Sequence, residues 1–210
     1  TFVKNWFDKY SIVWNEKTRK NNANGITTTI TACCSILSTF ITKLVGSGSK
    51  NKYVPNEAFT APEEFIIGLL NGYFSGDGYI SNNSVEASSA SKRLIEGINM
   101  LCSRFGIFGK VFTTQVTSNN FGTENILPAH RISIRAQWGK LFSQNIELLN
   151  NDKNRKLQNA KWTNVHRNFP TYNDVVLDKI KEIQKIGVEN HPKMYDLTIP
   201  STLNFGLANG

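Results

Sequence analysis

The sequence contains few of the residues that mark secreted, zinc-binding or membrane-embedded proteins. Only three cysteines occur among 210 residues and none lies in a CxxC pair, so neither a disulfide framework nor a cysteine zinc site is predicted. No apolar run approaches the roughly 20 residues of a membrane span. The first ten residues also lack the charged-then-apolar order of a signal peptide. We therefore expect an intracellular protein in which Cys33, Cys34 and Cys102 are reduced core residues.

Histidine is also scarce. His130, His166 and His191 are separated from one another and from any cysteine pair, which disfavours a zinc site or an HNH-type nuclease. The chain begins without methionine and stops at LANG, so we expect it to be a segment of something longer.

Positive charge is in excess. The chain has 24 Lys and Arg against 16 Asp and Glu, a formal net charge of +8, and such a field attracts polyanions. Nucleic acid is the favoured partner, and an inert basic surface is the alternative. Because 40% of the residues are apolar, an ordinary buried core is expected as well.

Local patterns predict a mixed α+β organisation. In the first part of the chain, these patterns predict a helix over 1–10, a polar stretch over 16–25 that ends in an NG turn, and a strand over 26–32. A helix over 34–46, closed by Gly46, and a linker to Pro55 follow.

A second series of elements follows this linker. A helix starts at Pro62 and ends at the GDG of residues 76–78, and two short strands follow over 79–83 and 84–90. The next elements are a helix over 91–106, alternating strands over 107–118 and 130–136 around a polar loop, and a helix over 137–149.

A weak internal repeat links the two series. Ile30, Ala32 and Leu37 align with Ile134, Ala136 and Leu141, in each case where a strand passes into a helix. The same shift aligns Lys52 with Lys156. The chain is therefore interpreted as the tail of one αββαββα unit followed by a complete second unit.

The string LLNGYFSGDGYI (69–80) carries the clearest chemical signal. Gly72 and Gly76 lie four residues apart on one helical face, where missing side chains let two helices approach closely. Asp77 ends that helix, and from there its carboxylate could hold Mg²⁺, which prefers carboxylates together with water and substrate oxygens. A plain helix-ending turn is the alternative reading of Asp77 and Gly78.

The segment LNGYFSGDG resembles the LAGLIDADG motif of the dodecapeptide homing endonucleases. ASSASKRLIEGINMLCSRFGI after it and NKYVPNEAFTAPEEFIIGLL before it are also similar to this family's sequences around the second motif. The resemblance covers most of residues 1–150. It implies a saddle of two αββαββα halves, a monomer with pseudo-twofold symmetry, whose strands lie in the major groove of double-stranded DNA while two motif helices pack at the centre.

The resemblance also implies an active site with Mg²⁺ ions that activate water and stabilise the leaving oxygen. Asp77 maps to the family's metal-binding acid, whereas Ser75 replaces the earlier Asp of the motif. Lys52 occupies the place of the basic active-site residue, and Lys156 is its repeat partner, for which Lys153 or Arg155 could substitute. Solvated lysines are the alternative for both positions. The first motif is absent from these residues, so this chain alone would hold half of an active site.

The predicted strands supply candidate DNA contacts. Polar side chains on a curved sheet can read base edges, while Lys and Arg neutralise phosphates. The selected residues are Asn82, Asn83, Lys110, Thr113, Gln115, Arg131 and Arg135, with Ser81, Ser84, Glu86, Thr117 and Ser133 beside them.

A second resemblance lies at residues 193–210. KMYDLTIPSTLNFGLANG is similar to the penultimate splicing block of inteins, a strand pair of the Hint fold, with Asp196 at its acidic position. Leu203 stands where this block often has His, which puts the proton-transfer route in doubt. The resemblance implies host exteins in cis, and short strands of a separate β domain are expected over 175–187 and 193–200, with a hinge near 166–174.

These observations predict three segments: the end of a first LAGLIDADG half (1–50), a second half (51–158) and a carboxy-terminal Hint segment (159–210). The favoured function is an intein-borne, Mg²⁺-dependent endonuclease that cleaves a long double-stranded DNA site. A nucleic-acid-binding regulator or maturase that does not cut is the first alternative, and a degenerate intein that only splices is the second.

Overall fold

The computed structural model describes residues 2–20, 26–118, 125–163, 171–172, 175–176, 180–185, 187, 189 and 192–193. The chain divides into two compact units, Thr1–Lys52 and Tyr53–Gly210, which we call unit 1 and unit 2 and describe separately. The fold class is mixed α+β, as predicted. In the described part of the chain, no helix combines the length and the apolar character needed to cross a membrane.

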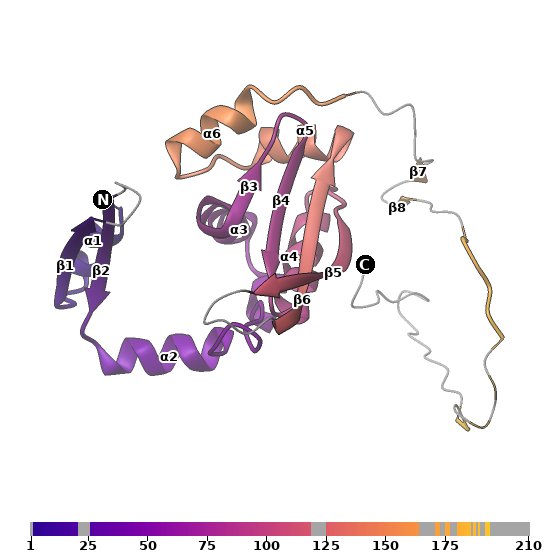
Figure 1. The fold of residues 1–210 in the computed structure, drawn as a ribbon. Helices are drawn as coiled ribbons and strands as arrows, with labels where there is room; N and C mark the ends of the chain where they lie inside the picture. Colours follow the sequence, from indigo (N-terminus) through magenta and orange to yellow (C-terminus); the bar gives the residue numbers. More distant parts are fainter. Residues whose placement is uncertain are drawn as a thin grey trace. The chain divides into compact units, whose positions relative to one another are not determined.

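Unit 1 has the element order αββα. Helix α1 (Phe2–Lys9) is followed by the antiparallel strands β1 (Trp14–Lys20) and β2 (Ile26–Ala32), and then by helix α2 (Ser35–Val45) (Figure 1). The predicted helices and the strand at 26–32 are confirmed. Gly46 ends α2 with φ 78°, and its N–H donates to the Thr42 carbonyl.

Strand β1 was not predicted, because residues 16–25 have the composition of a polar stretch. This strand forms because β2 pairs with it from Trp14↔Ala32 to Lys20↔Ile26. The Thr18 and Thr28 hydroxyls lie 3.3 Å apart across the hairpin. Pairing partners therefore outweigh the weak local strand preference of these polar residues.

The cysteines only partly follow the prediction. All three are free, and Cys102 is fully buried, as expected for a core residue. Cys33 is exposed, so the core prediction is wrong for it. Cys34 is half-buried because it caps α2: its sulfur accepts a hydrogen bond from the backbone N–H of Leu37, at 3.5 Å.

Unit 2 contains a complete αββαββα series. After a short 3₁₀ turn (Asn56–Thr60), the elements are α3 (Glu63–Asp77), β3 (Gly78–Ile80), β4 (Ser84–Ser89), α4 (Lys92–Ser103), β5 (Lys110–Ser118), β6 (Asn125–Arg135) and α5 (Ala136–Asn145). A further helix, α6 (Asn151–Gln158), was not expected from the sequence. The four strands form one antiparallel sheet in the order β3-β4-β6-β5.

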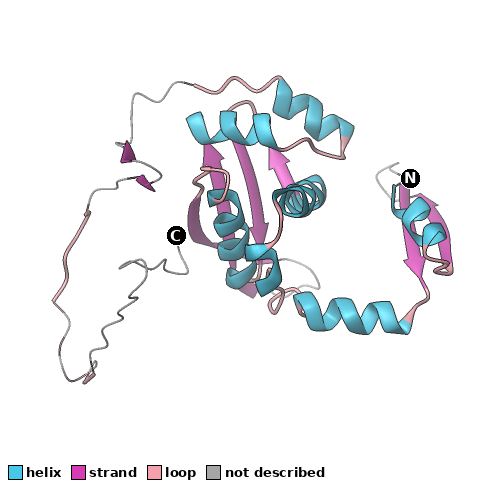
Figure 2. Ribbon diagram, turned by 180° about the vertical axis from the view of Figure 1, so that it is seen from behind, coloured by secondary structure: helices cyan, strands magenta, loops and turns pink. Residues whose placement is uncertain are grey.

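The core of unit 2 lies between this sheet and its helices. The sheet contributes Val85, Ala87, Ile132 and Ile134, and the helices contribute Ile66, Leu70, Phe74, Ile95, Ile98, Leu101 and Phe142, all of them buried. Seen from behind, α4 lies in front of the strands, while the face toward the viewer in Figure 1 carries no helix (Figure 2). Opposite faces of the strands therefore have different surroundings, with core on one side and an open surface on the other.

The start of β6 and the end of α5 differ from the prediction. Strand β6 begins at Asn125, inside the expected polar loop 118–128, and it includes Pro128 opposite Gln115. Strand β4 pairs with β6 only from His130 onward, so Pro128 sits where one side of β6 has no strand partner and a missing N–H is tolerated. Helix α5 ends at Asn145 rather than 149, where Ile146 becomes extended.

The described residues test only part of the expected carboxy-terminal strands. Two short pairing segments, β7 (Thr171–Tyr172) and β8 (Val175–Val176), lie at the start of this region. Residues 180–185 have no regular structure, so the strand predicted over 175–187 is wrong at these residues. Most of the predicted hinge, His166–Asp174, and nearly all of the splicing block at 193–210 lie outside the described residues.

Candidate nucleic-acid interface

Helix α3 is the element that presents Asp77. Pro62 precedes the helix, Glu63 and Glu64 occupy its first turn, and its inner face buries Ile66, Leu70 and Phe74. A Cβ at Gly78 would collide with the Phe74 carbonyl, so only glycine allows the chain to leave the helix here. The predicted end of the helix at GDG is confirmed, and Asp77 is its last residue.

The Asp77 carboxylate is exposed at the end of this helix. Within the described residues, no hydrogen bond or ion pair occupies it. No group of three or more His, Cys, Asp or Glu side chains gathers in that part of the chain either. Asp77 thus fits a divalent cation as one carboxylate ligand, with the remaining ligands coming from elsewhere.

The outer face of α3 is a stripe of glycines. Gly68, Gly72 and Gly76 follow at intervals of four residues, and a Cβ added to any of them would meet nothing within 4 Å. Phe65, one turn before Gly68, is 54% exposed. Within unit 2 this stripe is therefore open, as a helix-packing surface must be before its partner helix arrives.

Lys153 reaches the same end of α3 from helix α6. Its ammonium donates to the carbonyl oxygens of Ser75 and Gly76 at 2.9 and 2.8 Å, and more weakly to that of Phe74 at 3.4 Å. These carbonyls belong to the last turn of α3, where intrahelical partners are missing and a cation is favoured. Of the three basic residues of α6 that were candidates from the sequence (Lys153, Arg155 and Lys156), Lys153 therefore contacts the end of α3.

A polar clamp holds the α5–α6 connection against α3. The backbone N–H of Leu149 donates to Asn71 Oδ1 and to Ser75 Oγ, both at 2.9 Å, and Ser75 Oγ donates to Asn71 Oδ1 at 3.0 Å. Ser75, which stands where the family motif has its earlier Asp, thus helps to fix the loop that precedes Lys153.

The two lysines favoured by the sequence lie differently. Lys156 is exposed on α6, beyond Arg155, which pairs with Asp152 at 2.9 Å. Lys52 is exposed at the end of unit 1. The structure therefore does not bring Lys156 to the carbonyls that Lys153 contacts.

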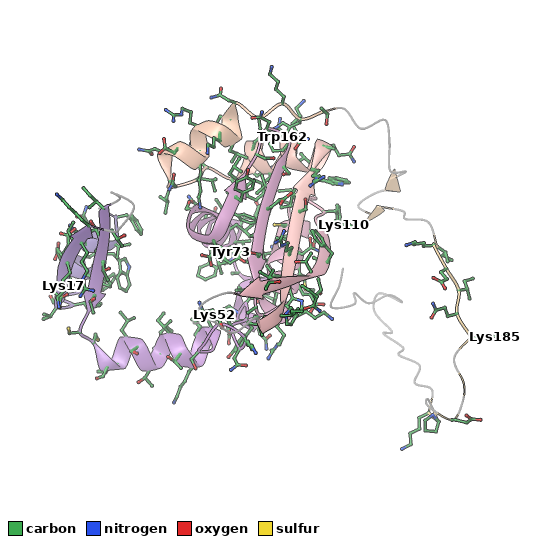
Figure 3. All side chains as sticks on the ribbon, viewed as in Figure 1. Lys17, Lys52, Tyr73, Lys110, Trp162 and Lys185 are labelled. Atoms are coloured by element: carbon green, nitrogen blue, oxygen red, sulfur yellow. The ribbon has the colours of Figure 1, made fainter. Side chains whose placement is uncertain are left out.

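Tyr73, one turn before Asp77, was not selected from the sequence. Its hydroxyl is buried without a hydrogen-bond partner in the described chain. Burial, and to a smaller degree the charge of Asp77, raise the pKa of Tyr73 to about 12. Tyr73 projects from α3, whereas Lys110 lies at the start of β5 (Figure 3).

The strand register divides the predicted DNA contacts between two faces. Val111 pairs with the buried Ile132, so neighbouring even-numbered residues of β5 point to the other, open face. Lys110 lies on that open face opposite Ser133, and Arg131 and Arg135 alternate with the buried Ile132 and Ile134. Thr113 and Gln115 point to the opposite face, and Thr113 Oγ1 lies 2.9 Å from His130 Nδ1.

Asn82 and Asn83 are exposed in the turn between β3 and β4. The Asn82 carbonyl accepts a hydrogen bond from the backbone N–H of Lys161 at 2.7 Å, which ties this turn to the segment after α6. Tyr79 pairs with Glu86 on the open face and is 64% exposed. Strand alternation from Ile80, which is buried, would have identified Tyr79 from the sequence.

Glu86 lies in a network at the centre of the open face. Its Oε1 accepts hydrogen bonds from Arg135 Nη2 at 2.9 Å and from Ser133 Oγ at 3.2 Å. Partial burial by itself would raise the pKa of Glu86, but hydrogen bonds from Arg135, Ser84 and Ser133, together with the charge of Arg135, lower it. Glu86 is therefore ionised and paired, so it adds little net negative charge to this face.

Comparison with protein families finds a similarity over part of unit 2. A family model described as "LAGLIDADG-like domain" matches residues 64–157, a little under half of the chain. This stretch of the chain is therefore similar to that family. Asp196, His166 and His191 lie outside the described residues.

The curated relatives are much longer proteins. A DNA polymerase of Thermococcus hydrothermalis is 27% identical over 188 residues, which cover 77% of this chain and 11% of that protein. A "Probable translation initiation factor IF-2" of Methanocaldococcus jannaschii is 39% identical over 66 residues, 30% of this chain and 6% of that protein. The chain thus spans about a tenth or less of these relatives.

A solved structure of mesophilic variants of the homing endonuclease I-DmoI overlaps 69% of this chain and 64% of that one, with TM-score 0.49 and 10% identity.

Proposed function

We propose that this chain is part of an intein that carries a LAGLIDADG homing endonuclease. In this proposal it binds a long double-stranded DNA site, hydrolyses phosphodiester bonds in it, and continues into a protein-splicing segment. The observation that carries the nuclease assignment is Asp77. Its exposed carboxylate ends a helix whose glycine stripe is open to a second helix.

The element order supports two related halves. Unit 2 contains αββαββα and unit 1 contains αββα, the order expected for the end of a preceding half. A second motif helix packed on Gly68, Gly72 and Gly76 would bring its own terminal acid beside Asp77, because glycine faces let helix backbones approach closely. The working enzyme would then be a monomer with pseudo-twofold symmetry.

The residues at the end of α3 have distinct tasks in this proposal. Asp77 holds a divalent cation, Mg²⁺ by preference, and a bound cation would supply Lewis acidity for activating water and stabilising the leaving oxygen. Lys153 fixes the last turn of α3 through three carbonyl oxygens and places a positive charge beside Asp77. Lys52 remains a candidate for the equivalent basic group, and Lys153 replaces Lys156 as the favoured residue of α6.

The open face of the sheet is the proposed DNA surface. Lys110 and Arg131 make no ion pair within the described chain, so both cations are available to phosphates. Asn82, Asn83 and Tyr79 extend this face at the β3–β4 hairpin. Thr113 and Gln115 lie on the other side of β5 and are contacts only if DNA wraps the far end of that strand.

The relatives support the intein part of the proposal. Segments similar to this chain occur in proteins with such different roles as a DNA polymerase and a translation initiation factor, and cover only a small share of each. An inserted element explains this pattern, because a domain required for either role would not be shared by both. Asp196 in KMYDLTIP is then the proposed acid of the splicing block, and the host protein supplies the exteins.

Asp77→Asn in the full-length protein tests the nuclease assignment. The variant keeps the shape of the side chain but removes a charged cation ligand, so Mg²⁺-dependent nicking of the uninterrupted host gene should fall by about 100-fold or more. Binding to the same duplex should stay within a few-fold. Asp152→Asn, an exposed aspartate on α6, is the matched control and should cut like the parent protein. Unchanged cleavage by Asp77→Asn would remove Asp77 from the mechanism.

A binding module that does not cut is the second candidate. The observation in its favour is that the cationic sheet face does not depend on Asp77. In that case the parent protein and Asp77→Asn would bind the duplex equally, and neither would cut it with any divalent cation. A protein that only splices would show no sequence-selective binding at all.

A further inference from the structure

The open face of the sheet holds two kinds of arginine. Arg131 is half-buried, and its Nε is buried without a hydrogen-bond partner in the described chain. Arg135 is 64% exposed at its side chain, yet it is held by two neighbours. Its Nε donates to Ser133 Oγ at 2.9 Å and its Nη2 donates to Glu86 Oε1 at 2.9 Å. Exposed ion pairs add little stability, so the main effect of these two contacts is to fix the direction of a flexible side chain.

The contacts leave one edge of the guanidinium unused. Arginine has five N–H donors in a planar fork. Ser133 takes the Nε donor and Glu86 takes one Nη2 donor, so both Nη1 donors and the second Nη2 donor remain. These remaining donors lie along the end of the fork and point away from the two residues that hold it. A pair of parallel donors of this kind matches two adjacent acceptors on a planar partner.

The backbone also fixes where Arg135 stands. Arg135 is the last residue of β6, and Ala136 immediately after it has φ 52°, in the left-handed region that residues with a Cβ rarely adopt. The chain therefore turns sharply from β6 into α5 at this point. Pairing of Arg135 with Ser84 places it beside the β3–β4 hairpin that carries Asn82 and Asn83.

We propose that Arg135 reads a guanine in the major groove, and that Glu86 and Ser133 are positioning residues that hold its guanidinium for this purpose. Guanine presents O6 and N7 as two adjacent acceptors in the major groove, and arginine is their commonest specific partner. Glu86 does not contact DNA in this arrangement. The inference rests on the proposed DNA-binding function and adds to it one base and the residues that select it.

Phosphate binding is the competing use of Arg135. A phosphate contact needs charge rather than a fixed orientation, and Glu86 cancels much of the charge of Arg135. Lys110, on the same face and without an ion pair in the described chain, is better suited to that task. The pairing with Glu86 therefore weakens Arg135 as a phosphate ligand, but it fixes the orientation of the N–H donors that remain free to contact a base.

The test begins with selection of duplexes from a randomised pool by the full-length protein. The enriched site should contain at least one dominant guanine. Replacing that guanine with 7-deazaguanine, which lacks the N7 acceptor but keeps O6, should weaken binding of the parent protein by about 5-fold or more, because one of the two acceptors of the bidentate contact is lost. Arg135→Ala should bind both duplexes equally. Because the change is made in the DNA, a folding defect cannot produce this pattern for the parent protein.

Two further variants separate positioning from charge. Glu86→Gln removes a negative charge, so total affinity for DNA should rise or stay level, yet the discrimination against 7-deazaguanine should shrink. Lys110→Ala should weaken binding to both duplexes by the same factor and keep the discrimination. A merely structural role for Glu86 would change affinity without changing discrimination.

The outcomes also distinguish this inference from the proposed function. If 7-deazaguanine at every enriched guanine leaves binding unchanged, or if Arg135→Ala keeps the discrimination, the reading of guanine by Arg135 is overturned and DNA binding stands. If no duplex is enriched, the proposed function fails and the inference fails with it.

Discussion

At the scale of single residues, Cys102 gives a direct test of the core. The thiol is fully buried, and burial raises its pKa from 9.0 to about 12. The folded-state pKa lies above the unfolded value, so the stabilisation is complete below pH 9 and is lost as pH rises toward 12. We expect the free energy of unfolding to fall above pH 9 by about 1.4 kcal/mol per pH unit from this one group.

Urea unfolding from pH 7.5 to 11 measures this slope. Cys102→Ala should start from lower stability, because it leaves a cavity, and should show a flatter decline above pH 9. Cys33→Ser is the control, because Cys33 is exposed and its replacement should leave the pH profile unchanged. Equal slopes for the parent protein and Cys102→Ala would mean that Cys102 does not stay neutral in the folded state.

At the scale of secondary-structure elements, two helical glycines should respond to alanine in opposite ways. A Cβ at Gly139 in α5 would overlap the ring of Trp162, whose side chain lies near α5 (Figure 3), so Gly139→Ala should destabilise unit 2 by about 1–3 kcal/mol. Gly68 in α3 has open space around it within unit 2, so Gly68→Ala in residues 1–210 should stabilise the helix by about 0.5–1 kcal/mol, whereas packing of the proposed second motif helix would reverse the sign. Thermal unfolding of the two variants compares them, and a loss of similar size in both would contradict this packing.

The elements also show which features local sequence can and cannot predict. Helix α3 was predicted at both ends because Pro62, the acidic first turn and Gly78 are local signals. Helix α6 was missed because its sequence, NDKNRKLQ, is polar and buries only Leu157. Its position depends on tertiary contacts, because Lys153 of this helix hydrogen-bonds to carbonyl oxygens at the end of α3. Contacts of this kind have no periodic signature.

In the candidate site, too, some features follow from local sequence and others depend on tertiary contacts. Asp77 was placed correctly at the end of its helix because the motif and the helix end coincide. Alternation alone places Lys110 and Gln115 on opposite faces of β5, but the register of β5 with β6 decides which of these faces lies against the core. The pairing of Arg135 with Glu86 joins β6 to β4, two strands that are distant in sequence.

At the scale of the whole molecule, the charge distribution and the division into units favour a large polyanionic ligand. The net charge of +8 is carried by a chain that divides between Lys52 and Tyr53 into two compact units. A long DNA site contacts more surface than one sheet of four strands offers. In the proposed function, a second half with its own sheet would add cationic contacts to the duplex.

Salt dependence gives the quantitative prediction for this surface. Each phosphate neutralised by Lys or Arg releases counterions, so the logarithm of the affinity should fall linearly with the logarithm of salt concentration. If the full-length protein contacts six or more phosphates, affinity for duplex DNA should drop by about 10³-fold or more between 50 and 200 mM salt. Fluorescence anisotropy with a labelled duplex, and with one of its strands as the control, measures both slopes. A duplex slope near zero would leave the basic charge without a role in DNA recognition. Tighter binding of the single strand would contradict a groove-binding sheet.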